Sequence, residues 1–191
     1  MRRCLSIVLG VLLLAGCASS PAPRFHALEA RALPGTQVLS LTMVVEAVGL
    51  PARVDRRQLV FGTGQVQIDE FERWAAPLRE ELGQVLALNL SRRLGAKQVS
   101  AWPQALIAEP DLRIYVDLAR FESVPGERAL IEASWAVRDD KGRMLANGRD
   151  VYQAVPTDLA VTSLVIAHDR TLVALSADIA EAIRQARPHK L

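Results

Sequence analysis

The chain has 191 residues, which is enough for one domain with a substantial hydrophobic core. It carries 23 Lys and Arg residues against 21 Asp and Glu residues, and two of the basic residues, Arg2 and Arg3, lie in a segment that we expect to be removed. A surface that binds nucleic acid normally shows an excess of basic residues, so this balance argues against nucleic acid as a partner.

The first 16 residues have the pattern of a secretory signal. Arg2 and Arg3 precede the apolar run Ile7–Leu14, which only Gly10 interrupts. This run is about half as long as the roughly 20 residues that a membrane-spanning helix needs. A charged start, a short apolar middle and small residues at the exit are typical of a signal peptide. We therefore expect residues 1–16 to be cleaved.

The residues that follow, Leu14-Ala15-Gly16-Cys17, resemble the bacterial lipobox, in which the cysteine is lipidated and becomes the first mature residue. The alternative is an ordinary cleaved signal that leaves an unmodified cysteine. A single acyl chain binds a membrane only marginally. The diacylglycerol and N-acyl chain that the resemblance implies on Cys17 would therefore hold the protein without a spanning helix, and no other cofactor is expected. In the sorting rule of such lipoproteins an aspartate after the cysteine retains the protein at the inner membrane, so Ala18 implies the outer membrane, with the domain facing the periplasm.

The organisation of the mature chain is simple. Cys4 leaves with the signal, so a mature chain acylated at Cys17 has no thiol for a disulfide, which the periplasm permits but does not require. Residues 17–24 are rich in Ser and Pro and are expected to form a flexible tether. We expect one domain over residues 25–187 and a short tail over residues 188–191.

The first part of the domain predicts short strands. The apolar and β-branched stretches bounded by Gly and Pro favour strands. The turn signature Gly62-Thr63-Gly64 separates two of them. The expected strands are Phe25–Leu28, Val38–Val48, Gln58–Phe61 and Gln65–Ile68.

A helix follows. Pro77 suits its first turn, Gly95 suits its end, and apolar residues recur at helical spacing between them. Asn89 lies almost on the same face, and we expect its amide to bond nearby backbone, with a ligand-binding role as the alternative. The apolar stripe consists of Leu78, Leu82, Val85, Leu86, Leu90 and Leu94.

The second part predicts a meander and a long helix. Alternating apolar and polar residues mark strands over residues 112–118, 129–137 and 143–153, and their short connections require antiparallel pairing. Apolar residues at helical spacing then predict a helix over about Leu159–Ala186. Together these elements predict an α+β single domain, a mixed and mainly antiparallel sheet with two long helices packed on one face.

No set of residues predicts catalysis. Histidines 26, 168 and 189 are isolated, and no metal-binding spacing or nucleophile elbow is present, so we expect neither an enzyme nor a metal site. His168 lies on the apolar face of the last helix, where we expect a satisfied core histidine. The acidic residues Asp69, Glu70 and Glu72 are expected to form a solvated cap before the first helix.

One charged stretch is a candidate contact site. Arg53, Arg56 and Arg57 lie in the segment Arg53-Val54-Asp55-Arg56-Arg57, which follows Pro51. They suit contact with lipid headgroups or with a protein partner. The alternative is an exposed loop whose charges compensate one another.

The segment over residues 45–94 resembles the ABC-type transport auxiliary lipoproteins, the paraquat-inducible-C-like group. In that pattern Leu-Pro precedes an Asp-Arg pair and a strand, and Trp-Ala-x-Pro-Leu opens a helix that ends in Asn-Leu. The matching residues are Leu50-Pro51, Asp55-Arg56, Trp74-Ala75-Ala76-Pro77-Leu78 and Asn89-Leu90, with Val116-Asp117, Phe121-Glu122, Trp135 and Leu175-Ser176-Ala177-Asp178-Ile179 in the second half. Arg53-Val54 and Phe61-Gly62 depart from it, where the family often has an aromatic-Leu pair before Asp-Arg and an arginine after the second strand.

The resemblance implies a non-catalytic subunit of an envelope lipid-transport system that supports envelope integrity. Its partners would be a periplasmic MCE-domain tunnel protein, which it docks at the outer membrane, and the inner-membrane transporter of that system. Self-association into a ring is compatible with this role. Two alternatives remain open: a structural lipoprotein that assists another outer-membrane assembly machine, and a periplasmic enzyme whose site is assembled from distant residues.

Overall fold

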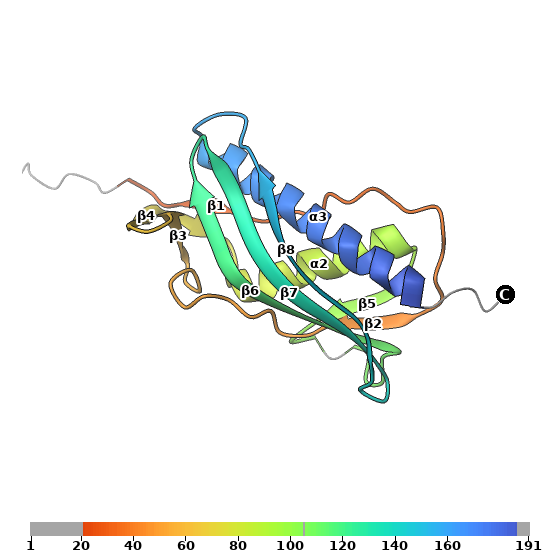
Figure 1. Ribbon diagram of the computed structural model, residues 1–191. Helices are drawn as coiled ribbons and strands as arrows, with labels where there is room; N and C mark the ends of the chain where they lie inside the picture. The colour runs from red at the N-terminus through yellow and green to blue at the C-terminus, as the bar shows by residue number, and fades with distance from the viewer. Residues whose placement is uncertain (1–20, 105, 187–191) are drawn as a thin grey trace, which may run out of the picture.

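The structure is a computed structural model that describes residues 21–104 and 106–186. In this part of the chain, strands form one sheet and two helices lie on the same side of it (Figure 1). The strands are β1 Arg24–His26, β2 Thr42–Val45, β3 Gln58–Gly62, β4 Val66–Trp74, β5 Gln98–Ala101, β6 Leu112–Val124, β7 Arg128–Asp139 and β8 Met144–Ala154, and the helices are α2 Leu78–Leu94 and α3 Val161–Ala186.

Strand β6 organises the sheet. Along one edge it pairs antiparallel with β7, which pairs antiparallel with β8. Two strands share its other edge: β2 runs parallel to residues 112–114, and β3 meets it near the far end, where Gly62 faces Ser123. Beyond these, β5 joins β2 in parallel, β4 joins β3 antiparallel, and β1 joins β4 in parallel. The predicted α+β class and mixed sheet are confirmed; the long ladders are antiparallel, whereas three short pairs are parallel.

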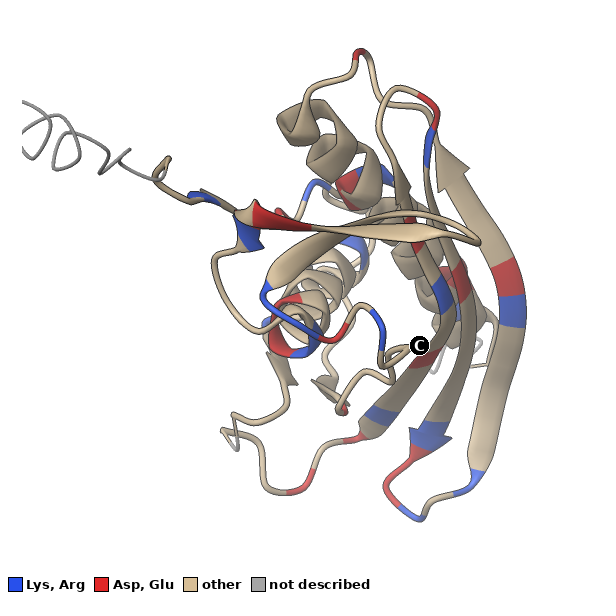
Figure 2. Ribbon diagram, turned by 90° about the vertical axis from the view of Figure 1, so that its left-hand side faces the viewer, with Lys and Arg blue, Asp and Glu red and all other residues tan. Residues whose placement is uncertain are grey.

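The helix α2 occupies the residues that its apolar stripe and end signals predict. Its stripe is buried from Leu78 to Leu94. Gly95 ends it with a left-handed φ of 61°, and the N–H of Ala96 donates to the carbonyl of Ser91. The helix α3 is amphipathic and buries Leu172, Leu175 and Ile179, among others, against β7, β8 and α2. Both helices therefore lie on the inner side of the curved sheet (Figure 2).

Close packing in the meander requires one glycine. Trp135 of β7 is buried and lies over Gly148 of β8, its direct pairing partner. A Cβ atom at position 148 would lie 2.6 Å from the indole ring of Trp135. The absent side chain of Gly148 thus provides the space in which the core tryptophan sits.

The predicted strands Phe25–Leu28 and Val38–Val48 are both shorter in the structure, which has β1 at residues 24–26 and β2 at residues 42–45. The segment between them bonds to both helices, and we call residues 27–41 the N-terminal strap. The N–H of Ala32 donates to Oδ1 of Asn89 at 3.0 Å, and the N–H of Leu39 donates to the carbonyl of Leu94 at 2.8 Å. The strap is not a strand because its backbone groups bond to the helices rather than to a neighbouring strand.

Two further differences concern β4 and β5. Strand β4 continues to Trp74, so Asp69, Glu70 and Glu72 lie within a strand and not in a solvated helix cap. Strand β5 was not predicted, since its four residues carry too little alternation to stand out. The domain is elongated in Figure 1: the described chain begins beside β1 and β4 at one end, and α3 finishes near β2 and β5 at the other.

Candidate functional site

Three aromatic side chains contact one another in the core of the domain, and their role is structural. His168 is stacked on Phe121, with ring centroids 4.1 Å apart, and Nε2 of His168 lies 2.8 Å from Oγ of Ser123. Phe121 also meets the ring of Trp74 edge-on at 6.2 Å. Complete burial lowers the pKa of His168 to about 3, so the imidazole is neutral. The expectation of a core histidine is confirmed, although Nδ1 has no hydrogen-bond partner among the described residues.

Glu72 ties the first strand to the sheet. Its carboxylate accepts a hydrogen bond from Arg24, and its Oε2 lies 2.6 Å from Nε2 of His26. Burial alone would raise the pKa of Glu72, but the hydrogen bonds from Arg24 and His26 outweigh it and hold the pKa below its usual value. Glu72 is therefore a buried ion-pair partner that fixes β1, which corrects its prediction as a solvated residue.

Buried polar side chains of the two helices hold the N-terminal strap. The expectation that Asn89 bonds backbone is confirmed by its contact with Ala32. Glu81 of α2 accepts the N–H of Leu28 at 3.0 Å. Asp169 of α3 accepts the N–H of Glu29 at 2.8 Å. Each of these bonds joins residues at least 53 positions apart, so the strap links both helices to the start of the chain.

Glu81 makes the stability of this region depend on pH. Burial raises the pKa of Glu81 to about 7, whereas an unfolded chain has an ordinary glutamate pKa near 4.5. The folded state therefore binds the proton more tightly, and the free energy of unfolding falls as the pH rises from about 4.5 to about 7. We expect Glu81→Gln to remove about 2–3 kcal/mol of this decline, because a neutral amide keeps the acceptor for Leu28. Urea denaturation at several pH values measures the difference between the two proteins.

The comparison with Glu81→Gln isolates one carboxyl group among several. Burial also raises the pKa of Asp169, which acts in the same direction, whereas the lowered pKa values of Glu72 and Glu122 act in the opposite direction. Glu72 and Glu122 are common to both proteins and cancel in the difference. The charge of Asp169 contributes to the raised pKa of Glu81, so the difference reports Glu81 together with its coupling to Asp169. If the free energies of unfolding of wild type and Glu81→Gln depend on pH in the same way, burial does not raise the pKa of Glu81 in the folded state.

The outer face of the sheet carries charges that compensate one another. Glu122 accepts hydrogen bonds from Arg120 at 2.8 Å and from Arg128 at 3.2 Å. Arg120 and Arg149 both pair with Glu132. Burial would raise the pKa of Glu122, but the two arginines hold it below its usual value. Figure 2 shows these alternating charges across the long strands, and such a face offers no uniform field to a polyanion.

The candidate arginines lie in the loop between β2 and β3. Arg53, Arg56 and Arg57 are exposed, and their side chains have no hydrogen-bond or ion-pair partner among the described residues. Asp55 in the same loop is already bonded to Arg79 at 2.7 Å, so it does not compensate them. The structure thus places three free cations together near the start of β3, and their contact with a headgroup or a partner stays a prediction.

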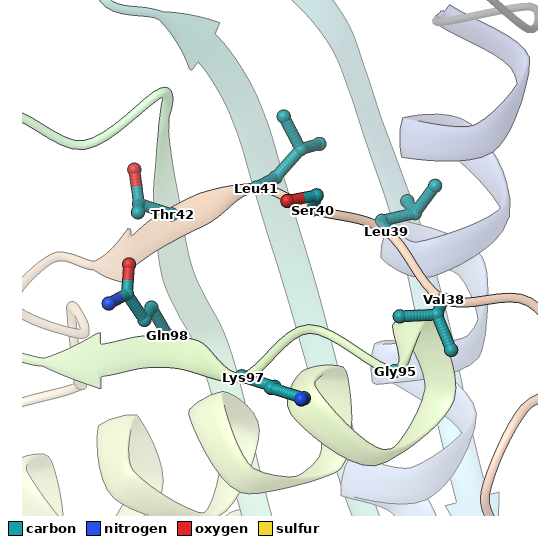
Figure 3. A pocket seen from close by; sticks show the side chains of 8 residues that line it. All are labelled: Val38, Leu39, Ser40, Leu41, Thr42, Gly95, Lys97 and Gln98. Atoms are coloured by element: carbon teal, nitrogen blue, oxygen red, sulfur yellow. The ribbon is translucent and has the colours of Figure 1, made fainter. Parts of the chain in front are cut away.

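A hollow of about 430 Å³ lies at the end of the domain where α3 finishes (Figure 3). It opens where the chain before β2 and the chain before β5 separate. Val38, Leu39 and Leu41 line one side, and Lys97 and Gln98 line the other. Val38 is 73% exposed, so this hollow presents apolar surface beside one cation.

A second hollow of about 450 Å³ adjoins the first one and shares Lys97 and Gln98 with it. Leu106 lines it and is 85% exposed, and Trp102 nearby is also exposed. We call the two hollows together the distal surface. The sequence did not reveal this surface, because its residues come from three separate segments and carry no periodic pattern.

The described residues hold no group of three His, Cys, Asp or Glu side chains that could bind a metal ion. Neither α2 nor α3 is long and apolar enough to cross a membrane. Cys17 and Ala18, the predicted lipidation and sorting residues, lie outside the described residues. Among the described residues, the candidate contact sites are the distal surface and the loop of Arg53, Arg56 and Arg57.

The family described as "ABC-type transport auxiliary lipoprotein component" matches residues 26–180. The chain belongs to this family. The match covers the described fold from the last residue of β1 to the last quarter of α3, and it confirms the resemblance that the segment over residues 45–94 carries.

Solved structures share the fold of this auxiliary lipoprotein. A crystal structure from Xanthomonas campestris, of the family DUF330, matches with a TM-score of 0.70 at 15% identity and covers 85% of this chain and 98% of its own. A crystal structure of an uncharacterized protein matches with a TM-score of 0.64 at 20% identity and covers 80% and 99%. A comparison with curated protein sequences gives no match. These likenesses concern the fold of the auxiliary lipoprotein.

Proposed function

We propose that this protein is a non-catalytic outer-membrane subunit of an MCE-type intermembrane lipid transport system. In this proposal acyl chains on Cys17 hold the domain at the outer membrane. The distal surface then binds the periplasmic MCE-domain tunnel protein, which an inner-membrane transporter serves. Docking the tunnel at the outer membrane supports the integrity of the envelope.

One observation supports this arrangement most directly. The described chain begins at the end of the domain that carries β1, and the distal surface lies at the opposite end, where α3 finishes (Figure 1). A lipoprotein anchored through its N-terminus would therefore present the distal surface to the periplasm. Apolar hollows with exposed large side chains are typical of protein contact sites.

The family supports the same role. An auxiliary component of a transporter needs a binding surface and a fixed position, and it needs no acid, base or nucleophile. The strongly shifted groups among the described residues are Glu81, Tyr152 and His168, and they have structural partners in the N-terminal strap, in α3 and in β6. They are accordingly assigned to stability and not to chemistry.

The distal surface is tested by charge insertion. We expect the double variant Val38→Glu and Leu106→Glu to lose co-purification with the MCE-domain protein by at least tenfold, because a desolvated charge in an apolar contact costs several kcal/mol. Leu88→Glu is the matched control, since Leu88 is 53% exposed on α2 and lies in neither hollow. Affinity capture of the lipidated protein from membranes, quantified for the MCE-domain protein, measures the loss.

The same capture separates the alternatives. Recovery of components of β-barrel insertion or lipopolysaccharide export in place of the MCE-domain protein would assign the lipoprotein to another outer-membrane machine. Equal recovery with the double variant and with Leu88→Glu would place the contact elsewhere on the domain, with the loop of Arg53, Arg56 and Arg57 as the next surface to test.

A further inference from the structure

Exposed large apolar side chains gather at the end of the domain where the described chain begins. Phe25 is 59% exposed and Leu159 is 77% exposed, and their grouping with further exposed apolar side chains is the feature that marks a contact surface. We call this set the proximal apolar surface. Its members are Phe25, Val66, Ile68, Phe71, Val155 and Leu159.

The register of the strands brings these residues to one end. Phe25 of β1 pairs with Arg73 of β4, which places it diagonally opposite Phe71. Arg24, His26 and Leu159 line the same hollow, so the start of α3 lies against the face of β1 opposite to Phe25. Because β1 is an edge strand, Phe25 and Leu159 flank this edge from its two sides. The turn after β6 also lies against this end, because a Cβ atom at Gly126 would lie 2.5 Å from the side chain of Leu159.

Charged groups at this end are largely engaged within the domain. Glu72 is paired with Arg24 and His26. Asp69 accepts the backbone N–H of Phe71 at 2.8 Å, and Asp158 accepts the N–H of Ala160 at 2.8 Å. Arg24 and Glu70 at this end keep most of their side chains exposed. The apolar side chains can therefore enter the interface while these charged groups stay among the headgroups.

The length of the chain before β1 indicates what covers this surface. Arg24 lies seven positions after Cys17, and a fully extended chain spans at most about 3.6 Å per residue, or about 25 Å in total. The helix α3 has 26 residues and is therefore about 39 Å long. A protein held through Cys17 thus keeps β1 within about 25 Å of the membrane, while the far end of α3 is free to point away.

We propose that the proximal apolar surface contacts the lipid surface directly, with Phe25, Phe71 and Leu159 in the interfacial layer and the distal surface facing away. This proposal rests on the lipidation of Cys17 in the proposed function. Aromatic and aliphatic side chains on a surface of balanced charge suit the boundary between headgroups and acyl chains. The covalent anchor supplies the affinity, and these side chains set the orientation of the domain.

The test uses the lipidated protein in vesicles of phosphatidylethanolamine and phosphatidylglycerol. Because the acylated chain has no other thiol, Phe25→Cys carries an environment-sensitive fluorophore at one site, and Val38→Cys carries it at the distal surface. We expect the probe at position 25 to shift its emission to shorter wavelength and to be quenched by lipid-borne quenchers. The probe at position 38 is expected to emit as in water, without quenching.

A second variant tests the role of the apolar side chains themselves. With the probe at Ile68→Cys, we expect Phe71→Ser with Leu159→Ser to reduce the quenching severalfold, and Leu33→Ser with Leu106→Ser to leave it unchanged. Water-like emission at position 25 in protein that stays on the vesicles would overturn the contact but leave the anchor intact. Protein that leaves the vesicles would instead overturn the lipidation on which the proposal rests.

Discussion

Replacement of Cys17 by serine is expected to release the protein from the membrane while the domain stays folded. Each buried methylene contributes about 0.8 kcal/mol to membrane binding, so the loss of all acyl chains removes far more free energy than the proximal apolar surface supplies. The domain keeps its fold because the described core is built from residues between Leu28 and Ile183, all of which the substitution leaves unchanged. Membrane fractionation and circular dichroism measure the two results.

The matched control for Cys17→Ser is Ala18→Asp, which keeps the lipid but changes the residue after it. We expect Ala18→Asp to remain with membranes and to move from the outer to the inner membrane on a density gradient. Retention of Cys17→Ser in the outer-membrane fraction would show that the protein is held by something other than acyl chains. An unchanged position of Ala18→Asp would remove the argument for the outer membrane.

The second large effect is expected from Phe121→Ala. The ring of Phe121 is buried between His168, on which it is stacked at 4.1 Å, and Trp74, which it meets edge-on. Removing a buried phenyl ring leaves a cavity and costs about 3–5 kcal/mol of the free energy of unfolding. For a domain of this size each kcal/mol lowers the melting temperature by about 2–4 °C, so we expect a decrease of roughly 10 °C. Thermal denaturation followed by circular dichroism measures it.

Phe71→Ala is the control for Phe121→Ala, because Phe71 has the same side chain but is 40% exposed on β4. We expect it to change the melting temperature in detergent solution by no more than about 2 °C, as is usual for surface positions. Equal losses for the two variants would mean that the stack of Phe121 and His168 contributes nothing beyond an ordinary surface contact.

The sequence predicts the elements whose signals are local. Helix α2 begins and ends as expected because Pro77, the apolar stripe and Gly95 all act within a few residues of one another. The meander of β6, β7 and β8 follows from alternation and short turns in the same way. In both cases the residues that determine the structure lie within the element or next to it.

The elements that the sequence does not predict depend on distant partners. Strand β5 has four residues and exists because β2 pairs with it. The predicted strand Phe25–Leu28 forms as β1 over residues 24–26 only, where β4 pairs with it. Glu72 becomes buried only because Arg24 and His26, almost 50 positions earlier, meet it. The N-terminal strap depends on Glu81, Asn89 and Asp169 in the same manner. The spacing of residues along the sequence does not indicate which distant residues will contact one another in the fold.

Among the candidate sites, too, the sequence predicts the one that lies in a single segment and not those assembled from distant segments. The loop of Arg53, Arg56 and Arg57 is recognisable from its composition, and its arginines are exposed as expected. The distal surface and the proximal apolar surface are assembled from separate segments, and single apolar residues such as Phe25 and Leu159 do not stand out in a chain of which half is hydrophobic. Their proximity is a property of the fold.

The parallel pairing of β1 with β4 also decides how the domain carries mechanical load. If a partner pulls on the distal surface while acyl chains hold Cys17, tension enters the domain along β1. The three residue pairs of the β1–β4 ladder then resist together in shear, and Glu72 adds its bonds to Arg24 and His26 across the same joint. In the proposed arrangement, the short first strand would thus be the coupling through which a membrane anchor and a periplasmic assembly exert force on one another.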